Sequence, residues 1–529
     1  MDSYDIIVIG GGSAGSAVAG RLSEDPALSV CLIESGGSND NWLIKTPGML
    51  AKVPEASNYR YDTVPQKHLD GRIGYQPRGR GLGGSSAINA MLYVRGNAWD
   101  YDNWAALGCD GWAWDDVLPY FKRAEHNERG GDALHGSGGP LNVMDQHYAN
   151  PASTAFVEAA ARLQLRRNDD FNGAEQDGFG LYQVTQKGGE RWSAARAYID
   201  PARGRKNLHI RTDTLVHRLL VEDGRATGVM VERGGKQEVL RAARAVILSA
   251  GAFGSPQILQ LSGLGPAQHL QDMGINVLAD RPAIGSDLQD HCDYVLGYET
   301  DSRDLIGQSL PGLVSIIGSV LRHRLNRTGM MTTPYAESGG FWRVRPDAPA
   351  PDVQYHFVPV VLEDHGRTVV KSHGFSVHSC VLRPESRGTV RLAGKNAAMA
   401  PAIDPNFLSD ERDMALMRDA VRLCKRICES APLADYQGRD RHPIDYNNDA
   451  ELDAMIRARA DTIYHPVGTC RMGNDADAVV DPHLRLNGVK GLYVADASVM
   501  PRLVSGNTNA PSIMIGERCA DFVKADLRG

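Results

Sequence analysis

An α/β fold with a parallel sheet, divided into at least two domains, is what this sequence predicts. Residues 4–9 and 245–250 are short apolar runs, typical of strands buried on both faces of a parallel sheet, and each leads directly into glycine. Residues 16–22 follow the first glycine-rich turn and have the small apolar side chains of a helix that packs on such a sheet. The chain of 529 residues is about three times as long as a typical domain, which favours two or more domains.

The composition is that of a globular protein and excludes several classes of function. Hydrophobic residues make up 42% of the chain and charged residues 23%, which argues against disorder. The formal net charge of −7 provides no basic surface for nucleic acid. No apolar run approaches the ~18 residues that cross a bilayer, and acidic Asp2 and Asp5 precede the first apolar run, so no signal peptide is expected. We therefore expect a cytoplasmic protein.

Cysteine and histidine spacing indicates no structural metal. The eight cysteines include no CxxC pair, so we expect neither a disulfide framework nor a structural zinc site. No spacing of histidines and carboxylates is typical of a metal site. Glycine, at 57 residues, exceeds the average usage of about 7%, which indicates tight turns or backbone held against a ligand.

Residues 10–15 have the pattern G-x-G-x-x-G between a predicted strand and a predicted helix. Gly10 permits the tight turn, Gly12 lets the backbone approach a pyrophosphate, and Gly15 lets the helix pack closely on the strand. Glu34 directly follows the next predicted strand, 29–33, where its carboxylate can bind both hydroxyls of a ribose. This region is predicted to bind a dinucleotide, and its residues alone do not distinguish NAD from FAD.

Two further glycine-rich stretches lie between apolar residues. Residues 79–91 carry Leu82 and Ile88 among Gly and Ser and continue into an apolar segment. This context favours backbone held against a ligand over a flexible surface linker. Residues 251–265 follow the predicted strand 245–250 and begin a helix.

Two segments near the C-terminus carry side chains suited to catalysis. His465 stands alone among small and apolar residues in the segment 464–473, where it is either a general base or a structural histidine. Asn507 and Asn509 precede a predicted helix at about 512–523, where they either cap the helix or polarise a ligand.

Together these segments resemble the glucose–methanol–choline (GMC) family of FAD oxidoreductases over essentially the whole chain. Residues 79–102 are similar to the family's first signature, and residues 251–265 match its second. Residues 464–473 and 507–511 are similar to its C-terminal active-site segments. Other segments resemble bacterial alcohol dehydrogenases related to choline dehydrogenase, namely 95–96, 178–187, 191–198, 284–291, 336–341 and 364–366.

The resemblance implies a discontinuous Rossmann-like FAD-binding domain and a substrate domain with a large mixed sheet backed by helices. The expected FAD-binding domain comprises residues 1–40, 75–100, 200–295 and 455–529. The expected substrate-binding domain comprises residues 41–74, 101–199 and 296–454.

The resemblance also implies which residues contact FAD. Val216 would touch the adenine through its backbone. Ile88 stands where certain members of the family carry the histidine that attaches FAD covalently, so we expect FAD to be held noncovalently. The expected FAD contacts are Gly10, Gly12, Ser13, Ala14, Gly15, Glu34, Gly83, Gly84, Ser85, Asn89, Ala90, Met91, Leu92, Val216, Ala250, Gly251, Asp496, Ala497 and Asn507.

The implied function is the FAD-dependent oxidation of a primary alcohol to an aldehyde. Such a reaction requires a base for the hydroxyl proton, flavin N5 as acceptor of the hydride from the α-carbon, and a donor that stabilises the forming alkoxide. His465 is the expected base, and Asn509 is the expected second catalytic residue because its amide can hydrogen-bond the substrate oxygen. The electrons would pass to a quinone or another acceptor.

Alternatives to this function stay open. The acceptor could be O₂, as in an alcohol oxidase, or the substrate could be choline. Choline would need an aromatic cage with a carboxylate, for which Glu337, Trp342 and Tyr335 are the candidates. A cyanohydrin lyase on the same fold, or a redox-silent flavoprotein with a binding role, are alternatives of other classes.

Residues 310–327 have the pattern of an amphipathic helix at the substrate entrance. Leu313, Ile316, Ile317, Val320 and Leu321 share the spacing of one apolar helical face, and a basic cluster of Arg322, His323, Arg324 and Arg327 follows. The pattern fits a helix packed on its own domain or on a second subunit. The pattern alone favours that packed helix, and the resemblance to a membrane-associated dehydrogenase raises an interfacial helix to about equal standing. Such a helix would make peripheral contact with the inner face of the cytoplasmic membrane, because it is too short to cross it.

Overall fold

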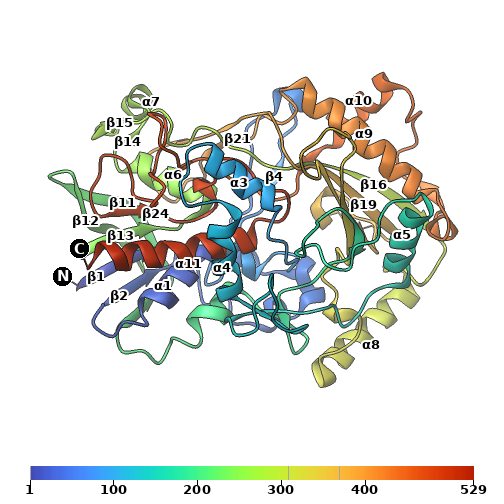
Figure 1. Cartoon of the computed structure of the whole chain (residues 1–529), viewed down its shortest axis with the longest axis horizontal. Helices are drawn as coiled ribbons and strands as arrows, with labels where there is room; N and C mark the ends of the chain where they lie inside the picture. Colours follow the sequence, from blue (N-terminus) through green and yellow to red (C-terminus); the bar gives the residue numbers. More distant parts are fainter. Residues whose placement is uncertain (1, 308, 369, 529) are drawn as a thin grey trace.

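The structure, a computed structural model, describes residues 2–307, 309–368 and 370–528, and for residues 310 and 311 it describes the backbone only. Two seven-stranded sheets occupy the two halves of the molecule, and both chain termini lie at the end that holds the first sheet (Figure 1). The predicted α/β class is thereby confirmed.

The first sheet has the strand order β10-β2-β1-β13-β12-β11, and β24 pairs with the last residues of β13. Its strands are β1 (Asp2–Ile9), β2 (Val30–Ile33), β10 (Leu208–Arg211), β11 (Thr214–Glu222), β12 (Arg225–Arg233), β13 (Lys236–Leu248) and β24 (Leu492–Val494). β12 is antiparallel to both of its neighbours, whereas the other pairings are parallel.

The parallel strands of this sheet end at one common edge. The pairing continues one residue beyond the strands, since Gly10 N–H donates to the carbonyl of Ile33 at 2.8 Å. The carboxyl ends of β1, β2, β13 and β24 therefore lie together, which is where α/β sheets bind their ligands. The strands predicted at 4–9, 29–33 and 245–250 are confirmed, the last as the end of β13.

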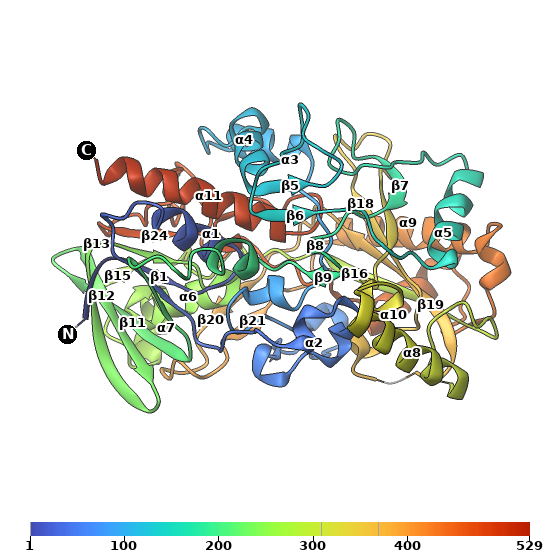
Figure 2. The same ribbon diagram turned by 90° about the horizontal axis from the view of Figure 1, so that it is seen from below.

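Eleven α-helices surround the two sheets in the described part of the chain. They are α1 (Ser13–Leu22), α2 (Trp42–Lys45), α3 (Ala98–Ala106), α4 (Trp114–Ala124), α5 (Pro151–Arg162), α6 (Gly251–Leu261), α7 (Ala267–Asp272), α8 (Leu310–Asn326), α9 (Glu411–Cys428), α10 (Asp449–Arg459) and α11 (Asn509–Asp526). Figure 2 shows α1 and α11 together on one side of the first sheet. No side chain caps the N-terminus of α1, whose first N–H groups are thus available to an anion.

The second sheet has the strand order β22-β16-β19-β18-β17-β7, and β23 also pairs with β16. Its strands are β7 (Gly178–Leu181), β16 (Cys292–Thr300), β17 (Ser338–Trp342), β18 (Val353–Val358), β19 (His373–Val381), β22 (Arg439–Asp440) and β23 (Asp461–Thr462). Every pairing in the second sheet is antiparallel, so the mixed sheet is the first one, whereas a mixed sheet was expected in the substrate domain. The reason is that β17, β18 and β19 follow one another without a crossover helix.

Side-chain alternation divides the second sheet into two different faces. On β18, Val353, Tyr355 and Phe357 belong to a hydrophobic core shared with α5 and α9. Gln354 and His356 point to the opposite face, because successive side chains of a strand alternate. This opposite face carries polar side chains and is turned toward the His465 region, since Gln354 hydrogen-bonds Asn507.

Short strands complete the fold as two-stranded sheets. They are β3 (Tyr61–Asp62), β4 (Tyr75–Gln76), β5 (Glu125–Asn127), β6 (Leu141–Val143), β8 (Gln186–Lys187), β9 (Glu190–Arg191), β14 (Leu264–Gly265), β15 (Ala279–Asp280), β20 (Thr389–Arg391) and β21 (Ala402–Asp404).

Helices α3 and α4 pack with the first sheet, although the predicted domain boundaries assign residues 101–199 to the substrate domain. Trp104 and Phe121 lie in the same hydrophobic core as β1, α1 and α11. Arg123 on α4 hydrogen-bonds both Glu517 and Asp521 on α11. A boundary read from sequence motifs missed this packing because α3 and α4 lie outside the glycine-rich motifs.

Among the described residues, no helix is both long and apolar enough to cross a bilayer. Within the same residues, no cluster of three or more His, Cys, Asp or Glu side chains has the arrangement of a metal site. The eight cysteines are all buried and unpaired in the part of the chain that the structure describes.

The contact between α1 and α11 predicts a sharp difference between two glycine-to-alanine substitutions. A Cβ at Gly516 on α11 would lie 2.4 Å from the carbonyl oxygen of Ala14 on α1. We therefore expect Gly516→Ala to lower the free energy of unfolding by about 1–3 kcal/mol and to lower the melting temperature.

Gly318→Ala on α8 is the matched control, because nothing lies within 4 Å of the added Cβ. Alanine favours a helix over glycine by about 1 kcal/mol, so the control should melt at or above the wild-type temperature. Thermal unfolding followed by fluorescence measures both. A Gly516→Ala variant as stable as the control would contradict the close packing.

Candidate active site

The side chain of Glu34 hydrogen-bonds three backbone segments at the edge of the first sheet. Its carboxylate accepts hydrogen bonds from the N–H groups of Gly11, Gly36 and Gly81, each at 2.9 Å. The side chain directly follows β2 and is buried. These bonds place the predicted ribose-binding carboxylate between the first and second glycine loops, and Oε2, which accepts only the Gly11 N–H, keeps a lone pair for a ligand.

The first two glycine loops contact each other through their backbones. Gly83 N–H donates to the carbonyl of Gly11 at 2.7 Å. A Cβ on Gly84, whose φ is +50°, would lie 2.7 Å from the Cα of Gly12. A side chain at residue 84 would fill the space between the two loops, so this close approach requires glycine at that position. Beside the uncapped start of α1, where Ser13, Ala14 and Gly15 lie, the arrangement fits a pyrophosphate.

A third loop joins the same edge through Asp496, which follows β24. Its Oδ2 accepts from Gly251 N–H at 2.8 Å and from Ser255 Oγ at 2.6 Å, at the start of α6. Burial raises the pKa of the Asp496 carboxyl. Ala250, Gly251, Asp496 and Ala497, which the resemblance selected, are thus brought together.

The other expected contacts surround this edge. Asn89 Oδ1 accepts from Arg191 Nη1 at 2.8 Å and from Met91 N–H at 3.0 Å. Arg191 is fully buried, and burial lowers its pKa to about 9. The strand that carries Val216 begins beside Glu34, since Thr214 N–H donates to the Glu34 carbonyl at 3.0 Å. Gly83, Gly84 and Ser85 lead into the turn before Ala90, Met91 and Leu92.

His465 lies where the two sheets meet. Asp290 holds its backbone, since Asp290 Oδ1 accepts from His465 N–H at 2.8 Å, and burial raises the Asp290 pKa to about 6. Residues 289 and 467 pair as a short antiparallel bridge just before β16. This bridge sets His291 beside His465.

The His465 imidazole hydrogen-bonds on both sides. Its Nδ1 lies 2.9 Å from Nδ1 of His291, and its Nε2 lies 3.1 Å from Nδ2 of Asn507. Burial, helped by nearby His291, His356 and Arg78, holds the pKa of His465 well below its usual range. The ring is therefore neutral at neutral pH and can accept a proton.

The two asparagines before α11 occupy different positions. Asn507, expected as an FAD contact, is the amide that hydrogen-bonds His465. Asn509, the expected second catalytic residue, instead accepts a hydrogen bond from Ser13 Oγ at 2.7 Å through Oδ1. Within the described residues, no hydrogen bond joins Asn509 to His465, and its Nδ2 is free to donate to a ligand.

Sequence reasoning took His291 as structural and did not single out Gln354. Gln354 Nε2 donates to Asn507 Oδ1 at 3.2 Å and so orients the amide next to His465. The sequence offered one signal for His291, its place directly after Asp290 in a segment that resembles the family. For Gln354 the only signal was its place in a largely apolar strand, where Gln354 and His356 alternate with Val353, Tyr355 and Phe357.

Whole-chain comparisons identify the family of this chain. The N-terminal family model described as GMC oxidoreductase matches residues 4–293, and the C-terminal model of the same family matches residues 384–516. An alcohol dehydrogenase [acceptor] of Pseudomonas putida is 43% identical over 99% of this chain and 96% of its own length. The chain belongs to the GMC oxidoreductase family.

Other relatives of this GMC oxidoreductase act in different reactions. An oxygen-dependent choline dehydrogenase of Rhizobium johnstonii is 44% identical over 98% of this chain and 95% of its own length. Among solved structures, pyridoxine 4-oxidase from Mesorbium loti is 33% identical with a TM-score of 0.89 and 98% coverage of both chains. A formate oxidase of Aspergillus oryzae, studied for its FAD modification, is 26% identical with a TM-score of 0.93, covering 100% of this chain and 99% of that one.

The three side chains considered for a choline cage do not assemble one. In this GMC oxidoreductase, Glu337 is fully buried, and its carboxylate accepts from Ser153 Oγ and Thr333 Oγ1 at 2.6 Å each. Tyr335 donates its hydroxyl hydrogen to the carbonyl of Gly48, and Trp342 packs near Phe179. The Glu337 carboxylate therefore bonds side chains inside the protein and is not part of a choline cage.

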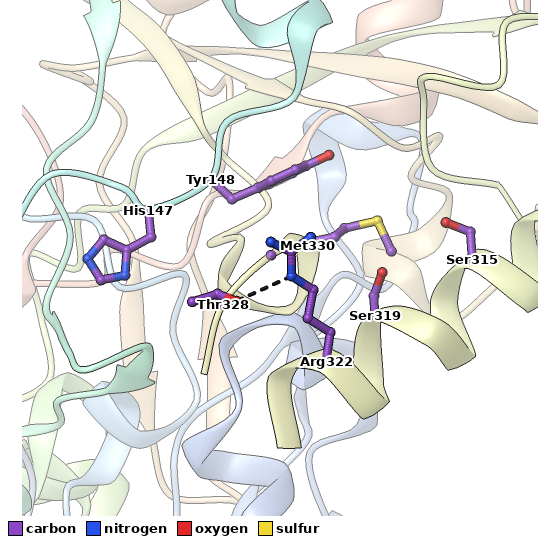
Figure 3. Close-up of a pocket in the computed structure, with 8 residues that line it drawn as sticks. His147, Tyr148, Ser315, Ser319, Arg322, Thr328 and Met330 are labelled. Carbon is purple, nitrogen blue, oxygen red and sulfur yellow. Dashed lines mark hydrogen bonds between the residues drawn. The ribbon is translucent and has the colours of Figure 1, made fainter. Parts of the chain in front are cut away.

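A cavity of about 620 Å³ opens beside α8 (Figure 3). Ser315, Ser319 and Arg322 of α8 form one wall, and Tyr148 lies opposite. The Arg322 Nε–H donates to Thr328 Oγ1 at 3.3 Å. None of the residues selected for catalysis or FAD binding lines this cavity.

Proposed function

We propose that this GMC oxidoreductase oxidises a primary alcohol to an aldehyde with FAD. The observation that carries the proposal is the buried, neutral imidazole of His465, with Asn507 on its Nε2, beside an edge of glycine loops that fits a dinucleotide. The full-length likeness to an alcohol dehydrogenase [acceptor] supports the substrate class. Choline is a second candidate because relatives of similar identity act on it, although Glu337 is not available as its carboxylate.

In this proposal each of these residues has a separate role toward a bound alcohol. His465 Nε2 takes the hydroxyl proton once the alcohol hydroxyl replaces Asn507 Nδ2 as its hydrogen-bond donor, because Nε2 is the ring nitrogen that faces the start of α11. Asn509 Nδ2, whose amide is oriented by Ser13, donates to the developing alkoxide. When bound, FAD supplies the acceptor for the hydride that leaves the alcohol's α-carbon. Glu34 and the loops at Gly12 and Gly84 would hold it.

Removing the imidazole of His465, the proposed base, should strongly slow alcohol oxidation while FAD stays bound. Mixed anaerobically with a panel of primary alcohols, the wild-type protein should lose its yellow colour. His465→Ala should keep its FAD and bleach roughly 10²–10⁴-fold more slowly, the usual contribution of a positioned base. Single-turnover absorbance measures both, and normal bleaching of His465→Ala would contradict its role.

The same bleaching measurement tests the amide of Asn509. Asn509→Ala should slow bleaching by about 10²-fold if its amide stabilises the alkoxide. Asn507→Ala should lose the hydrogen bond that faces His465 Nε2. A wild-type protein that stays yellow with every alcohol but cleaves a cyanohydrin would make it a lyase.

We also propose that FAD is held noncovalently. Ile88 at the end of the turn formed by residues 84–87 has a hydrocarbon side chain, which cannot bond to the flavin. Precipitation in acid should therefore release all the yellow colour into the supernatant. Flavin that remained on the denatured protein would contradict this proposal.

The acceptor is proposed to be a quinone, reached at a membrane surface through α8. Five apolar side chains of this helix are exposed, with exposed fractions of 43% for Leu313, 71% for Val314, 61% for Ile317, 59% for Leu321 and 81% for Leu325. Figure 1 shows α8 at the margin of the molecule, beyond the second sheet. An exposed apolar stripe of this length fits the interfacial rather than the internally packed alternative.

The predicted basic cluster is smaller than the sequence indicated. His323 is fully buried and hydrogen-bonds the Gly189 carbonyl at 2.9 Å, so it is not part of the surface. Arg327 pairs with Glu190, and the Arg324 guanidinium lies 4.5 Å from the ring centre of Trp42. Arg322 at the cavity and Arg324 are the cations left to meet anionic headgroups.

Charges placed on the exposed stripe should prevent membrane binding without unfolding the protein. We expect wild type to co-sediment with vesicles that contain an anionic phospholipid at low salt. Val314→Glu with Ile317→Glu should stay in the supernatant, because both side chains are already mostly exposed.

Ile73→Glu with Leu278→Glu is the matched control, since those exposed apolar residues lie outside α8. The control should sediment like wild type. Wild type that stays in the supernatant, or equal binding by both double variants, would contradict the proposal. A wild-type dimer that the α8 variant alone dissociates would identify the stripe as a contact between two copies.

A further inference from the structure

A continuous chain of hydrogen bonds passes through His465 and ends at a backbone carbonyl on each side. Its members come from six separate segments, and the chain contains no charged group. In order they are the carbonyl of Leu382, His291, His465, Asn507, Gln354, Tyr182 and the carbonyl of Tyr355. Because a carbonyl oxygen can only accept, each end dictates where the hydrogens lie.

From the Leu382 end, the direction of donation is determined step by step. His291 Nε2 lies 3.0 Å from the Leu382 carbonyl and must carry a hydrogen. Burial lowers the pKa of His291 to about 3, so the ring is neutral and its Nδ1 carries none. The Nδ1 of His465, 2.9 Å away, must then be the donor. In a neutral ring this leaves Nε2 of His465 without a hydrogen.

The Tyr355 end leads independently to the same result. Tyr182 has one hydroxyl hydrogen, which it donates to the Tyr355 carbonyl at 2.7 Å. Its oxygen therefore accepts from Gln354 Nε2 at 3.2 Å. The same amide nitrogen donates to Asn507 Oδ1, which turns Nδ2 of Asn507 toward His465. The amide can only donate there, so His465 Nε2 must accept.

We propose that His291 is a positioning residue that holds His465 in the tautomer with its hydrogen on Nδ1 and none on Nε2. The inference rests on the proposed function, in which Nε2 accepts the alcohol proton. The two rings meet at right angles, with an interplanar angle of 90°, so the Nδ1 lone pair of His291 is directed at one hydrogen only. After His465 gains the proton at Nε2, its Nδ1–H still donates to His291, and the ring keeps its orientation.

A neutral acceptor has a different effect from the carboxylate that often orients a catalytic histidine. A carboxylate would select the same tautomer but would also stabilise the protonated ring. His291 selects the tautomer without that charge, and burial, the largest cause, holds the His465 pKa below its usual range. Proton uptake at Nε2 is thus favoured mainly by the developing alkoxide that replaces the hydroxyl group.

Two substitutions of His291 separate positioning from simple packing. In His291→Asn, Oδ1 falls near the place of Nδ1 and can still accept from His465, although the bond to Leu382 is lost. His291→Phe retains a buried ring and offers no acceptor. In the FAD-loaded enzyme, we expect His291→Phe to slow the limiting rate of flavin bleaching by about 10- to 100-fold, with little change in the alcohol concentration needed for half-saturation. His291→Asn should recover most of that rate.

Nitrogen-15 NMR of histidine-labelled holoenzyme observes the tautomer itself. The protein has 16 histidines, and the His465→Ala spectrum identifies the signals of His465 by subtraction. Wild type should show a hydrogen on Nδ1 and none on Nε2 of His465, and His291→Phe should shift hydrogen occupancy toward Nε2. A wild-type His465 with its hydrogen on Nε2, or a His291→Asn variant as slow as His291→Phe, would overturn the inference.

The failure of this inference is distinguishable from the failure of the proposed function. If His465→Ala bleaches slowly but His291→Phe bleaches at the wild-type rate with an unchanged tautomer, His465 is the base and His291 is merely structural. If His465→Ala bleaches normally, His465 is not the base and the positioning role of His291 is overturned with it.

Discussion

The buried carboxylate of Glu34 is the interaction on which the rest of the site depends. Three N–H groups from three separate loops converge on it, and two of those loops are far apart in the sequence. A carboxylate removed from water is stable only when hydrogen bonds replace its hydration. The loops at Gly11, Gly36 and Gly81 are therefore held at one point of the sheet edge, and the close approach of Gly84 to Gly12 follows from it.

The polar face of the second sheet is turned toward the edge of the first sheet where the glycine loops meet. Alternation along β18 sends Tyr355 into the core under α9 and Gln354 toward Asn507. The bridge between residues 289 and 467 brings the start of β16 alongside the His465 segment. His465, the proposed base, is thus fixed by backbone pairing on one side and by an oriented amide on the other. Its burial keeps it neutral and ready to accept a proton.

Much of this arrangement is local and could be predicted from the sequence. The strand, glycine turn and helix at residues 4–22 are adjacent in the chain, so the anion-binding start of α1 follows from local geometry and glycine conformation. Glu34 was predictable because it directly follows a buried strand that must lie beside β1. The spacing of Leu313, Ile317 and Leu321 likewise predicted the apolar stripe of α8, because helical periodicity is a property of the segment itself.

The tertiary structure alone decided which polar side chains meet. Asn507 and Asn509 lie two residues apart in similar surroundings, and only the packing of α11 on α1 directs the first to His465 and the second to Ser13. His323 belongs to a basic run in the sequence, yet it is buried against Gly189, since a helix turns successive side chains to different faces. The local signals at His291 and Gln354 do not reveal their roles, because a hydrogen-bond direction depends on partners from distant segments. The sequence by itself determined the loops that can hold a dinucleotide and the histidine that can act as a base. The hydrogens on that histidine are placed by two backbone carbonyls, those of Leu382 and Tyr355, which only the folded chain brings within reach.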